Sequence, residues 1–538
     1  MSESADVVVA GAGHNSLITA AYLTKAGYEC LVLDARPIPG GGAATEQLGA
    51  FGPDYRIDSC STGHTLIRVN PVLLADELGL HADYGLEYIE PDPVAHVAFP
   101  DGEQLTQWLD LDRTCEEIAR FSARDAEAYR RLIAEYDEVK LIYALSRLTP
   151  PGFGPPLEQL LLDHPRGRIW LRRNAITAWE VIRREFEERH VQAFVTWQAL
   201  QTAVPLDAPG SGVNVYSLLF ARQSRSWSIP RGGSGSLTQA LVRYLEDNGS
   251  RVVCGRRVTE LVLQGGRCVG VETEDGERWL GSKAVLSTVH VKHLVEMAPA
   301  DTWGEEFIYG VETYDLGMPG MAVYLATTAE PLFVTPDGER SAVSAGTVGW
   351  PEDVLELGRA IRDGRPFDET PWLLMATPTL VDPERAPAGH HTVKLLSGQT
   401  KELPDRYASW DERKEDVADR QISYLRRFVP NLAPENIVAR YVKGPADFER
   451  DNPHMIDGTF HGGDRSLAFS GANRPVPGWS DHRMPIPGLY QTGGTTSIGG
   501  SITGVPGRNA AIVMLSDLGE QNPQEVMSGP GRARAGSH

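Results

Sequence analysis

Residues 6–34 (DVVVAGAGHNSLITAAYLTKAGYECLVLD) decide the fold of this chain. They begin with a short β-branched run at 6–10, which is typical of a strand buried on both faces of a parallel sheet. A glycine-rich turn follows, and residues 17–26 then carry apolar side chains at helical spacing. A second apolar run at 29–33 ends in an aspartate. The stretch predicts one βαβ unit with its glycines at the first turn.

Four residues of this unit have the chemistry of a dinucleotide site. Gly11 permits a tight turn off the strand, and Gly13 lacks a Cβ, so the backbone can approach a diphosphate at the positive end of the following helix. Asp34 lies at the tip of the second strand, where its carboxylate can accept hydrogen bonds from both ribose hydroxyls and would repel a 2′-phosphate. Ser16 takes the third glycine position, and its small side chain still allows close packing of helix and strand.

A second glycine cluster, 40–45 (GGGAAT), distinguishes between the dinucleotides. It begins six residues after Asp34 and therefore brings more bare backbone to the same diphosphate. An NAD site does not need this second cluster, whereas the longer, bent FAD molecule does. The pattern indicates FAD, and a flexible surface loop is the alternative.

A third glycine-rich region lies near the C-terminus. Residues 488–494 (GLYQTGG) have the pattern of a strand that runs into glycines, and residues 498–509 (IGGSITGVPGRN) precede a helix expected at 510–515. A helix N-terminus attracts negative charge. In a flavoprotein its natural target is the N1–C2=O edge of the isoalloxazine, which becomes negative on reduction.

Three segments resemble the phytoene-desaturase-like flavoproteins, which include carotenoid desaturases, carotene ketolases and retinol saturase. They are 11–17 (GAGHNSL), 228–237 (SIPRGGSGSL) and the terminal 474–511. The cluster at 40–45 is also similar to the GG motif of flavoproteins with two dinucleotide-binding domains. With the motifs above, the resemblance implies that FAD is bound by Gly11, Gly13, His14, Asn15, Ser16, Asp34, Ala35, Gly40, Gly41, Gly42, Ala43, Ala44, Thr45, Val258, Gly493, Gly494, Gly504 and Val505.

The expected fold class is α/β, with a Rossmann-type FAD-binding domain of the two-dinucleotide-binding-domain or amine-oxidase-like kind and an interleaved, mixed α+β substrate domain. The FAD-binding domain is expected to be discontinuous, from residues 1–75, 225–300 and 466–520. Residues 76–224 and 301–465 are expected to bind the substrate. Residues 521–538, rich in Gly, Ser and Arg, are expected to form a flexible tail.

His64 and His461 are the candidate catalytic residues. An imidazole with a pKa near working pH can accept a proton or bind a substrate, and for His64 the alternative is a histidine that only orders its loop. The resemblance implies that His461 lies near the flavin ring.

Two tryptophans and two arginines have less specific expectations. Trp227 and Trp479 either line the substrate cavity or pack in the core. Arg474 and Arg508 bind the diphosphate or a substrate carboxylate, or else form structural ion pairs. No H-E-x-x-H, P-loop or Ser-His-Asp pattern is present, so metal catalysis, phosphoryl transfer and hydrolysis have no basis in the sequence, and no metal is expected.

Composition excludes several other classes. The 538 residues include 51 basic and 72 acidic side chains, a net charge of −21, which argues against nucleic-acid binding. Five scattered cysteines without a C-x-x-C pair argue against a disulfide framework. No signal peptide or long apolar stretch is seen, so a cytoplasmic location is expected, with contact to a membrane surface left open.

These features predict an FAD-dependent oxidoreductase that transfers a hydride from a substrate C–H to flavin N5. By the resemblance, the reaction is desaturation or dehydrogenation of a small apolar or alicyclic substrate. The alternatives are an amine oxidase, a non-redox isomerase on the same fold, or a binding protein without catalysis. O₂, a quinone or another acceptor could reoxidise the flavin, and the oligomeric state is left open.

Overall fold

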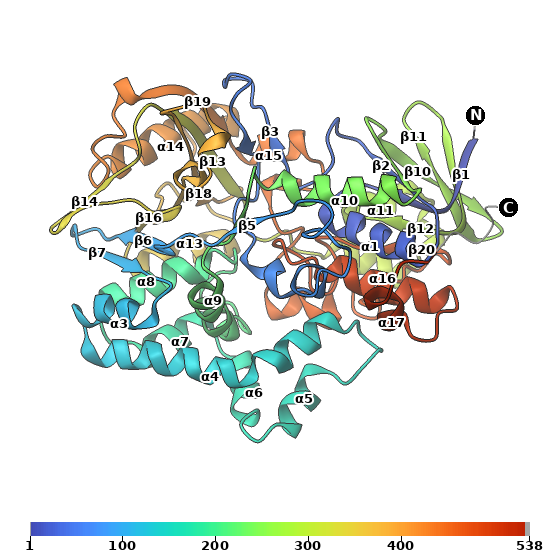
Figure 1. Ribbon diagram of the computed structural model, residues 1–538, viewed down its shortest axis with the longest axis horizontal. Coiled ribbons are helices and arrows are strands. Elements are labelled where there is room, and N and C mark those ends of the chain that lie inside the picture. The colour runs from blue at the N-terminus through green and yellow to red at the C-terminus, as the bar shows by residue number, and fades with distance from the viewer. Residues whose placement is uncertain (1, 533–538) are drawn as a thin grey trace.

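The computed structural model describes residues 2–532, which form two regions, each built around a mixed sheet (Figure 1). The first sheet has the order β10-β11-β12-β1-β2-β9, and β20 pairs with β12. Its strands are β1 (Ser2–Ala10), β2 (Cys30–Asp34), β9 (Arg251–Cys254), β10 (Val258–Gln264), β11 (Arg267–Thr273), β12 (Arg278–Ser287) and β20 (Leu489–Gln491). Its β9, β2, β1, β12 and β20 run parallel, while β10 and β11 extend the sheet as antiparallel strands. All seven strands lie within 1–75, 225–300 and 466–520.

The central strand β1 is buried on both faces, as its β-branched sequence predicts. Val7 and Val9 pack in the core on one side, while Val8 and Ala10 pack in the core on the other. One side is covered by the helices α1 (His14–Lys25), α10 (Gly235–Asp247) and α16 (Val505–Asp517). The predicted βαβ unit is therefore β1-α1-β2, and its glycines form the first turn.

Two of these helices begin earlier than their apolar spacing suggests. Helix α1 starts at His14, with Gly13 as its N-cap. Helix α16 starts at Val505 rather than at 510, because Gly504 takes a positive φ of 66° that ends the preceding loop and Pro506 fits the first helical turn.

The expectation of a flexible tail at 521–538 is wrong for its first part. Helix α17 (Pro523–Ser528) buries Val526 and Met527 against the core beneath α1. The Lys25 ammonium group donates a hydrogen bond to the carbonyl oxygen of Met527 at 2.8 Å. Residues 533–538 lie outside the described residues.

The second sheet has the order β19-β13-β18-β17-β16-β6-β7. Its strands are β6 (Ala95–Ala98), β7 (Gln104–Gln107), β13 (Gly320–Thr327), β16 (Ser344–Val348), β17 (Trp372–Ala376), β18 (His391–Gly398) and β19 (Ile437–Lys443). They all lie within 76–224 and 301–465. Three small two-stranded sheets accompany the large ones: β3 (Thr45–Glu46) with β4 (Ile57–Asp58), β5 (Tyr88–Ile89) with β8 (Ile229–Pro230), and β14 (Phe333–Thr335) with β15 (Gly338–Arg340).

A group of helices lies below the second sheet in Figure 1. These helices are α3 (Leu111–Ala119), α4 (Ala123–Leu148), α5 (Leu157–Asp163), α6 (Arg168–Ala175), α7 (Ala178–Glu185), α8 (Arg189–Leu200) and α9 (Gly212–Arg225). Two tryptophans join α8 to the sheet, because the indole N–H of Trp197 donates to the Leu373 carbonyl and that of Trp372 donates to the Trp197 carbonyl, both at 3.0 Å. The remaining helices are α2 (Pro71–Leu74), α11 (Val291–Leu294), α12 (Glu305–Glu312), α13 (Pro351–Arg362), α14 (Trp410–Leu425) and α15 (Pro445–Asp451).

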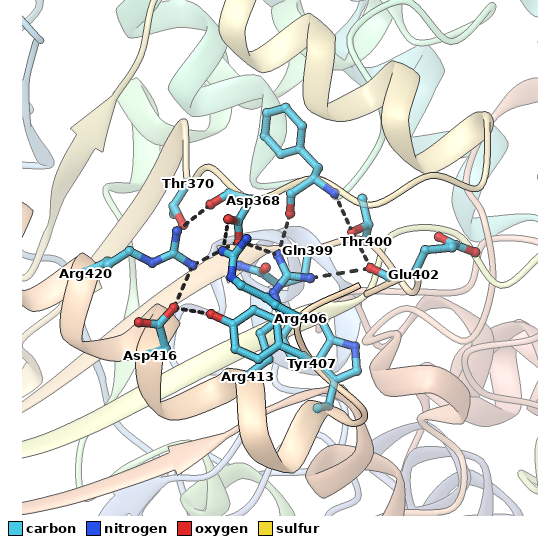
Figure 2. A network of polar contacts seen from close by, with 12 residues as sticks. Asp368, Thr370, Gln399, Thr400, Glu402, Arg406, Tyr407, Arg413, Asp416 and Arg420 are labelled. Carbon is cyan, nitrogen blue, oxygen red and sulfur yellow. Dashed lines mark hydrogen bonds and ion pairs between the residues drawn. The ribbon is translucent and has the colours of Figure 1, made fainter. Parts of the chain in front are cut away.

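A polar network around Asp368 fixes the segment that leads into β17 (Figure 2). Its carboxylate lies 3.1 Å from the guanidinium of Arg420 and 3.7 Å from that of the buried Arg413, and it also pairs with Arg406. Burial alone would raise the pKa of Asp368, but the hydrogen bonds from Arg406 and Arg420 hold it below its ordinary value. The network thereby positions Trp372, the first residue of β17.

No helix in the described part of the chain combines the length and the apolar composition that crossing a bilayer requires.

Candidate active site

The first two glycine clusters meet in space. Gly13 pairs with Gly40 as an isolated bridge, and the Gly40 N–H donates to the Ala12 carbonyl at 2.8 Å. Gly41 lies so close that a Cβ there would be 3.4 Å from the Cα of Gly13. Ser16, at the third position of the motif, donates its hydroxyl to the carbonyls of Gly11 and Gly13 at 2.6 and 2.9 Å, which fixes the turn.

The third glycine cluster arrives at the same place through Thr288, which follows β12. A Cβ on Gly11 would lie 2.4 Å from Cγ2 of Thr288, and a Cβ on Gly493 would lie 2.4 Å from its Oγ1. Both glycines also have positive φ, 99° and 96°. The ends of β1, β12 and β20 can therefore come together only with glycine at these two positions.

These ends open onto a cavity of about 540 Å³. The predicted FAD-binding residues that line it are Gly11, Gly13, His14, Asn15, Asp34, Ala35, Gly41, Gly42, Val258, Gly493 and Gly494. The others lie outside the cavity wall: Ser16, Gly40, Ala43, Ala44, Thr45, Gly504 and Val505. For this second set, contact with FAD stays a prediction.

Thr45 illustrates what the second set does in the fold. Its hydroxyl donates to Asp58 at 2.8 Å and accepts the N–H of Gly235 at 2.8 Å. Asp58 in turn forms a buried ion pair with Arg385 at 2.8 Å. Thr45 thus joins the GG segment to the start of α10 through a buried polar group.

Asp34 is positioned at one end of the cavity by the backbone. Its two carboxylate oxygens accept the N–H of Ala12 at 2.7 Å and the N–H of Arg36 at 2.8 Å. Burial raises the pKa of Asp34, while these two donors favour the charged form. Arg36, Val258 and Thr259 line the same cavity. A carboxylate held in this way has further lone pairs to accept ribose hydroxyls, as the sequence predicts.

His64 does not line the cavity. Its Nδ1 is in a hydrogen bond with the Tyr88 hydroxyl at 3.1 Å, and its Nε2 is in one with the Ser234 hydroxyl at 2.6 Å. Burial lowers the pKa of His64 to about 3, so the ring is neutral. We infer that His64 orders the 60–65 loop, which was the alternative interpretation of this residue.

His461 lines the cavity, and its hydrogen bonding defines the tautomer. Its Nδ1 accepts the backbone N–H of Ser501 at 2.9 Å, and Arg474 donates to its carbonyl at 2.7 Å. Burial, with Arg465 and Arg474 nearby, holds the pKa of His461 well below its ordinary value. The neutral ring therefore carries its proton on Nε2 and can donate a hydrogen bond.

Further histidines line the cavity, and of these sequence reasoning identified only His14, as an FAD-binding residue. The rings of His290 and His454 lie 5.2 Å apart, and among the residues that the structure describes the buried His290 Nε2 has no hydrogen-bond partner. His14 has a similarly unpartnered Nε2, and burial lowers the pKa values of His14 and His454 to about 4. Because these residues come from separate segments, no sequence spacing could have revealed the group. Within residues 2–532 no cluster of His, Cys, Asp and Glu is arranged to hold a metal ion.

The structure distinguishes between the two expectations for each tryptophan and arginine. Trp227 lines the cavity, whereas Trp479 packs against Phe307 in the core. Arg474 donates to backbone carbonyls, including that of Gly494 at 3.0 Å. Arg508 pairs with Glu77 at 3.2 Å. Both arginines are thus engaged within the protein and are not part of the cavity wall.

The half of the cavity away from Asp34 is mainly apolar, and its polar side chains include Gln201, Arg222 and Lys394. It is lined by Leu218, Trp227, Ala322, Trp372, Leu374, Leu396, Phe448, Met455 and Phe460. Trp227 packs directly on the backbone, because a Cβ on Gly63 would lie 2.5 Å from its indole ring. Lys394 donates to the Cys60 carbonyl and to the Thr62 hydroxyl, the latter at 2.8 Å, and thereby fixes the 60–62 segment beside this apolar wall.

The lining residues fit FAD. The three glycine segments expose bare backbone at one point, and a Cβ on Gly13 would have its first neighbour 3.9 Å away, so the space above it is open to a diphosphate. Asp34 offers a carboxylate for the ribose at one end of the cavity. The same cavity continues past the glycines to the apolar half. Fold and site together define an FAD-dependent oxidoreductase.

Comparison with known proteins gives the family. The sequence profile of the flavin containing amine oxidoreductases matches residues 17–507, and the chain belongs to this family. A limonene dehydrogenase subunit of Castellaniella defragrans is 28% identical over 97% of both chains. Hydroxyneurosporene desaturase of Cereibacter sphaeroides is 32% identical, over 96% of this chain and 98% of its own. Among solved structures, putrescine oxidase bound to putrescine has a TM-score of 0.62 at 15% identity and covers 96% of this chain and 99% of its own.

These findings confirm the predicted resemblance, fold class and cofactor. FAD is the cofactor of this chain, and the chain is an oxidoreductase.

Proposed function

We propose that this protein is an FAD-dependent dehydrogenase or desaturase of an apolar substrate. The observation that carries the proposal is the chemical character of the substrate half of the cavity. Its wall is built mainly from aliphatic and aromatic side chains, and the carboxylates that line the cavity in the described residues are Asp34 and Glu296. Asp34 belongs to the ribose end, and Glu296 lies 3.6 Å from His293, on a segment that packs against β10.

This distribution argues against an amine substrate. An ammonium group buried in an apolar chamber needs a negative partner, because an unpaired charge is costly to desolvate. The substrate half instead contains two cationic side chains, Arg222 and Lys394. The names of two relatives, one a limonene dehydrogenase and the other a hydroxyneurosporene desaturase, agree with apolar substrates.

When bound, the isoalloxazine of FAD supplies a hydride acceptor at N5. The chain itself orients the substrate and excludes water. Trp227, Trp372 and Phe460 form a wall that surrounds an apolar molecule and holds a C–H bond in place. Gly13 and Asn15, at the start of α1, would hold the diphosphate in the middle of the cofactor through their backbone.

The second hydrogen leaves as a proton, and the geometry restricts where it can go. His461 has its Nδ1 lone pair occupied by the Ser501 N–H and its Nε2 already protonated, so the neutral ring cannot accept a proton from the substrate. His64 lies outside the cavity wall with both nitrogens engaged. The proton therefore goes neither to His461 nor to His64, and the neutral rings of His14 and His454 in the cavity wall are the candidates to accept it. His461 acts as a hydrogen-bond donor toward the cavity.

Anaerobic mixing of the holoenzyme with a small panel tests the proposal. The panel contains limonene, geranic acid, cyclohexylamine and putrescine, and the readouts are bleaching of the yellow flavin band and the mass of the product. We expect bleaching with an apolar compound and a product that has lost two hydrogens. Bleaching by the amines alone would show amine oxidation instead. Conversion without a mass change would show isomerisation, and binding without conversion of any compound would indicate a binding protein.

A further inference from the structure

Arg222, on α9, is a buried cation without a counter-charge. It lines the substrate half of the cavity and is only 7% exposed. Its Nη1 donates to the Thr65 hydroxyl and its Nη2 to the Gln201 side-chain carbonyl, both at 2.7 Å. Its Nε is buried, and no residue in the described part of the chain accepts a hydrogen bond from it. Both acceptors are neutral, and a guanidinium has more N–H donors than they use.

Other buried arginines of the described chain are compensated. Arg385 pairs with Asp58 at 2.8 Å, and Arg508 pairs with Glu77 at 3.2 Å. Arg474 donates to the backbone carbonyls of Gly494, His461, Asp464 and Phe469. Neither Arg474 nor Arg222 forms an ion pair with any residue that the structure describes, but Arg474 has four carbonyl acceptors, whereas Arg222 has two neutral acceptors and an Nε without one. Burial lowers the pKa of Arg222 only to about 9, so it is still a cation at neutral pH.

An uncompensated buried charge is costly, which indicates that something outside the protein neutralises it. The surroundings define what fits. Leu218 lies one turn earlier on α9, and the guanidinium of Arg222 is 5.7 Å from the centre of the Trp227 ring. A molecule that reaches Arg222 must therefore have an apolar body and one polar end. A single guanidinium balances a monoanion, whereas a phosphate monoester carries nearly two charges and would leave one unpaired.

We propose that Arg222, held in place by Thr65 and Gln201, binds the carboxylate of an apolar carboxylic acid in the substrate cavity. This rests on the proposed function and makes it more specific, since the substrate becomes an apolar acid rather than a plain hydrocarbon. The planar carboxylate matches the fork of N–H donors on the guanidinium. Thr65 and Gln201 hold that fork in place, and Leu218 and Trp227 contact the apolar body.

Calorimetric titration of the holoprotein at neutral pH tests the site, with three probes that share one carbon skeleton: geranic acid, methyl geranate and geranylamine. We expect the acid to bind roughly 10- to 100-fold more tightly than the ester, because the ester keeps the apolar contacts but lacks the charge. The amine should bind most weakly. Equal binding of acid and ester by the unmodified protein would overturn the proposal without any variant.

Variants then assign the effect to Arg222. Arg222→Gln should remove the preference for the acid and leave the affinity for the ester within about twofold, while Arg222→Lys should restore part of it. The control is Arg225→Gln, one turn further along α9, where the side chain is 38% exposed and 4.0 Å from Glu90. It should bind all three probes like the unmodified protein.

Flavin content and the unfolding midpoint, measured for each variant, separate a folding defect from a lost contact. If Arg222→Gln weakened acid and ester equally with its flavin retained, the residue would be structural and the proposal wrong. Failure of this site is distinct from failure of the proposed function. A protein that dehydrogenates limonene but shows no preference for the acid would keep the function and lose the carboxylate site.

Discussion

Gly13→Leu should abolish FAD binding while leaving the apoprotein folded. Gly13 has φ −70° and ψ 158°, which any residue adopts without strain, and it makes no side-chain cap. A Cβ there would have Oγ1 of Thr288 as its first neighbour, at 3.9 Å, so the protein has room for it. The side chain would instead occupy the part of the cavity where we predict that the backbone meets the diphosphate of FAD. The substitution therefore changes the cofactor site and little else.

The magnitudes follow from these distances. Loss of glycine freedom in the unfolded chain stabilises the apoprotein by about 0.4–1 kcal/mol, and a less favourable N-cap offsets a similar amount, so the net change stays within about 1 kcal/mol. A leucine at the diphosphate removes backbone contacts and displaces the ligand. We expect at least about 2.8 kcal/mol of lost binding energy, or roughly 100-fold in Kd.

Fluorescence titration of the deflavinated protein with FAD gives the Kd, and urea unfolding of the same apoprotein gives its stability. Gly11→Ala is the contrasting variant, because its φ of 99° and a contact of 2.4 Å to Thr288 make it a folding mutation. Its apoprotein should lose about 1–3 kcal/mol or more of stability. An unchanged FAD affinity in Gly13→Leu would refute the assignment of the glycine turn to the diphosphate.

Three further substitutions test the scaffold. Asp58→Asn breaks the buried pair with Arg385 and should lower the free energy of unfolding in urea by about 3–5 kcal/mol, whereas a loss below about 1 kcal/mol would show that the pair contributes little. Asp368→Asn leaves the buried Arg413 with backbone partners only and should lower the free energy of unfolding in urea by about 1–3 kcal/mol. Its flavin content should not change, because the network lies outside the cavity wall. Burial lowers the pKa of His96 from 6.5 to about 4, so between these pH values the unfolded chain binds a proton that the native state does not. The contribution of His96 to stability should therefore fall by up to about 3 kcal/mol as the pH drops through this window. In His96→Asn, the free energy of unfolding should depend less steeply on pH between 6.5 and 4.

The cofactor half of the site could be predicted from the sequence because its signals are local. A buried strand, a glycine turn and an aspartate at the end of the next strand lie within 6–34 and require one another sterically. The structure brings Gly13 and Gly41 into contact, as the two motifs imply. For Gly504 and Thr45 contact with FAD stays a prediction, and the structure shows what they do in the scaffold: Gly504 caps α16, and Thr45 joins the GG segment to Asp58.

The substrate half could not be predicted, because its residues converge only after folding. Arg222, Trp372 and His454 belong to a helix, a strand and a loop with no fixed separation in the sequence. The helix at 523–528 was missed for a related reason. Its sequence has weak apolar patterning, and only the packing of Val526 and Met527 against the core beneath α1 makes it stable.

The charge of the whole chain and the charge of the cavity have separate physical roles. The excess of 72 acidic over 51 basic residues belongs to the solvated surface, where salt screens it within about 10 Å. Salt does not screen charges inside the cavity in this way. The buried cations Arg222 and Lys394 have no carboxylate of the described cavity wall beside them, so they decide which substrates can enter. The glycine scaffold binds the same cofactor whatever those few side chains are. A fold shared with an amine-oxidising protein at 15% identity is thus compatible with a substrate of opposite charge, because selectivity rests on Arg222 and its neighbours rather than on the residues that form the fold.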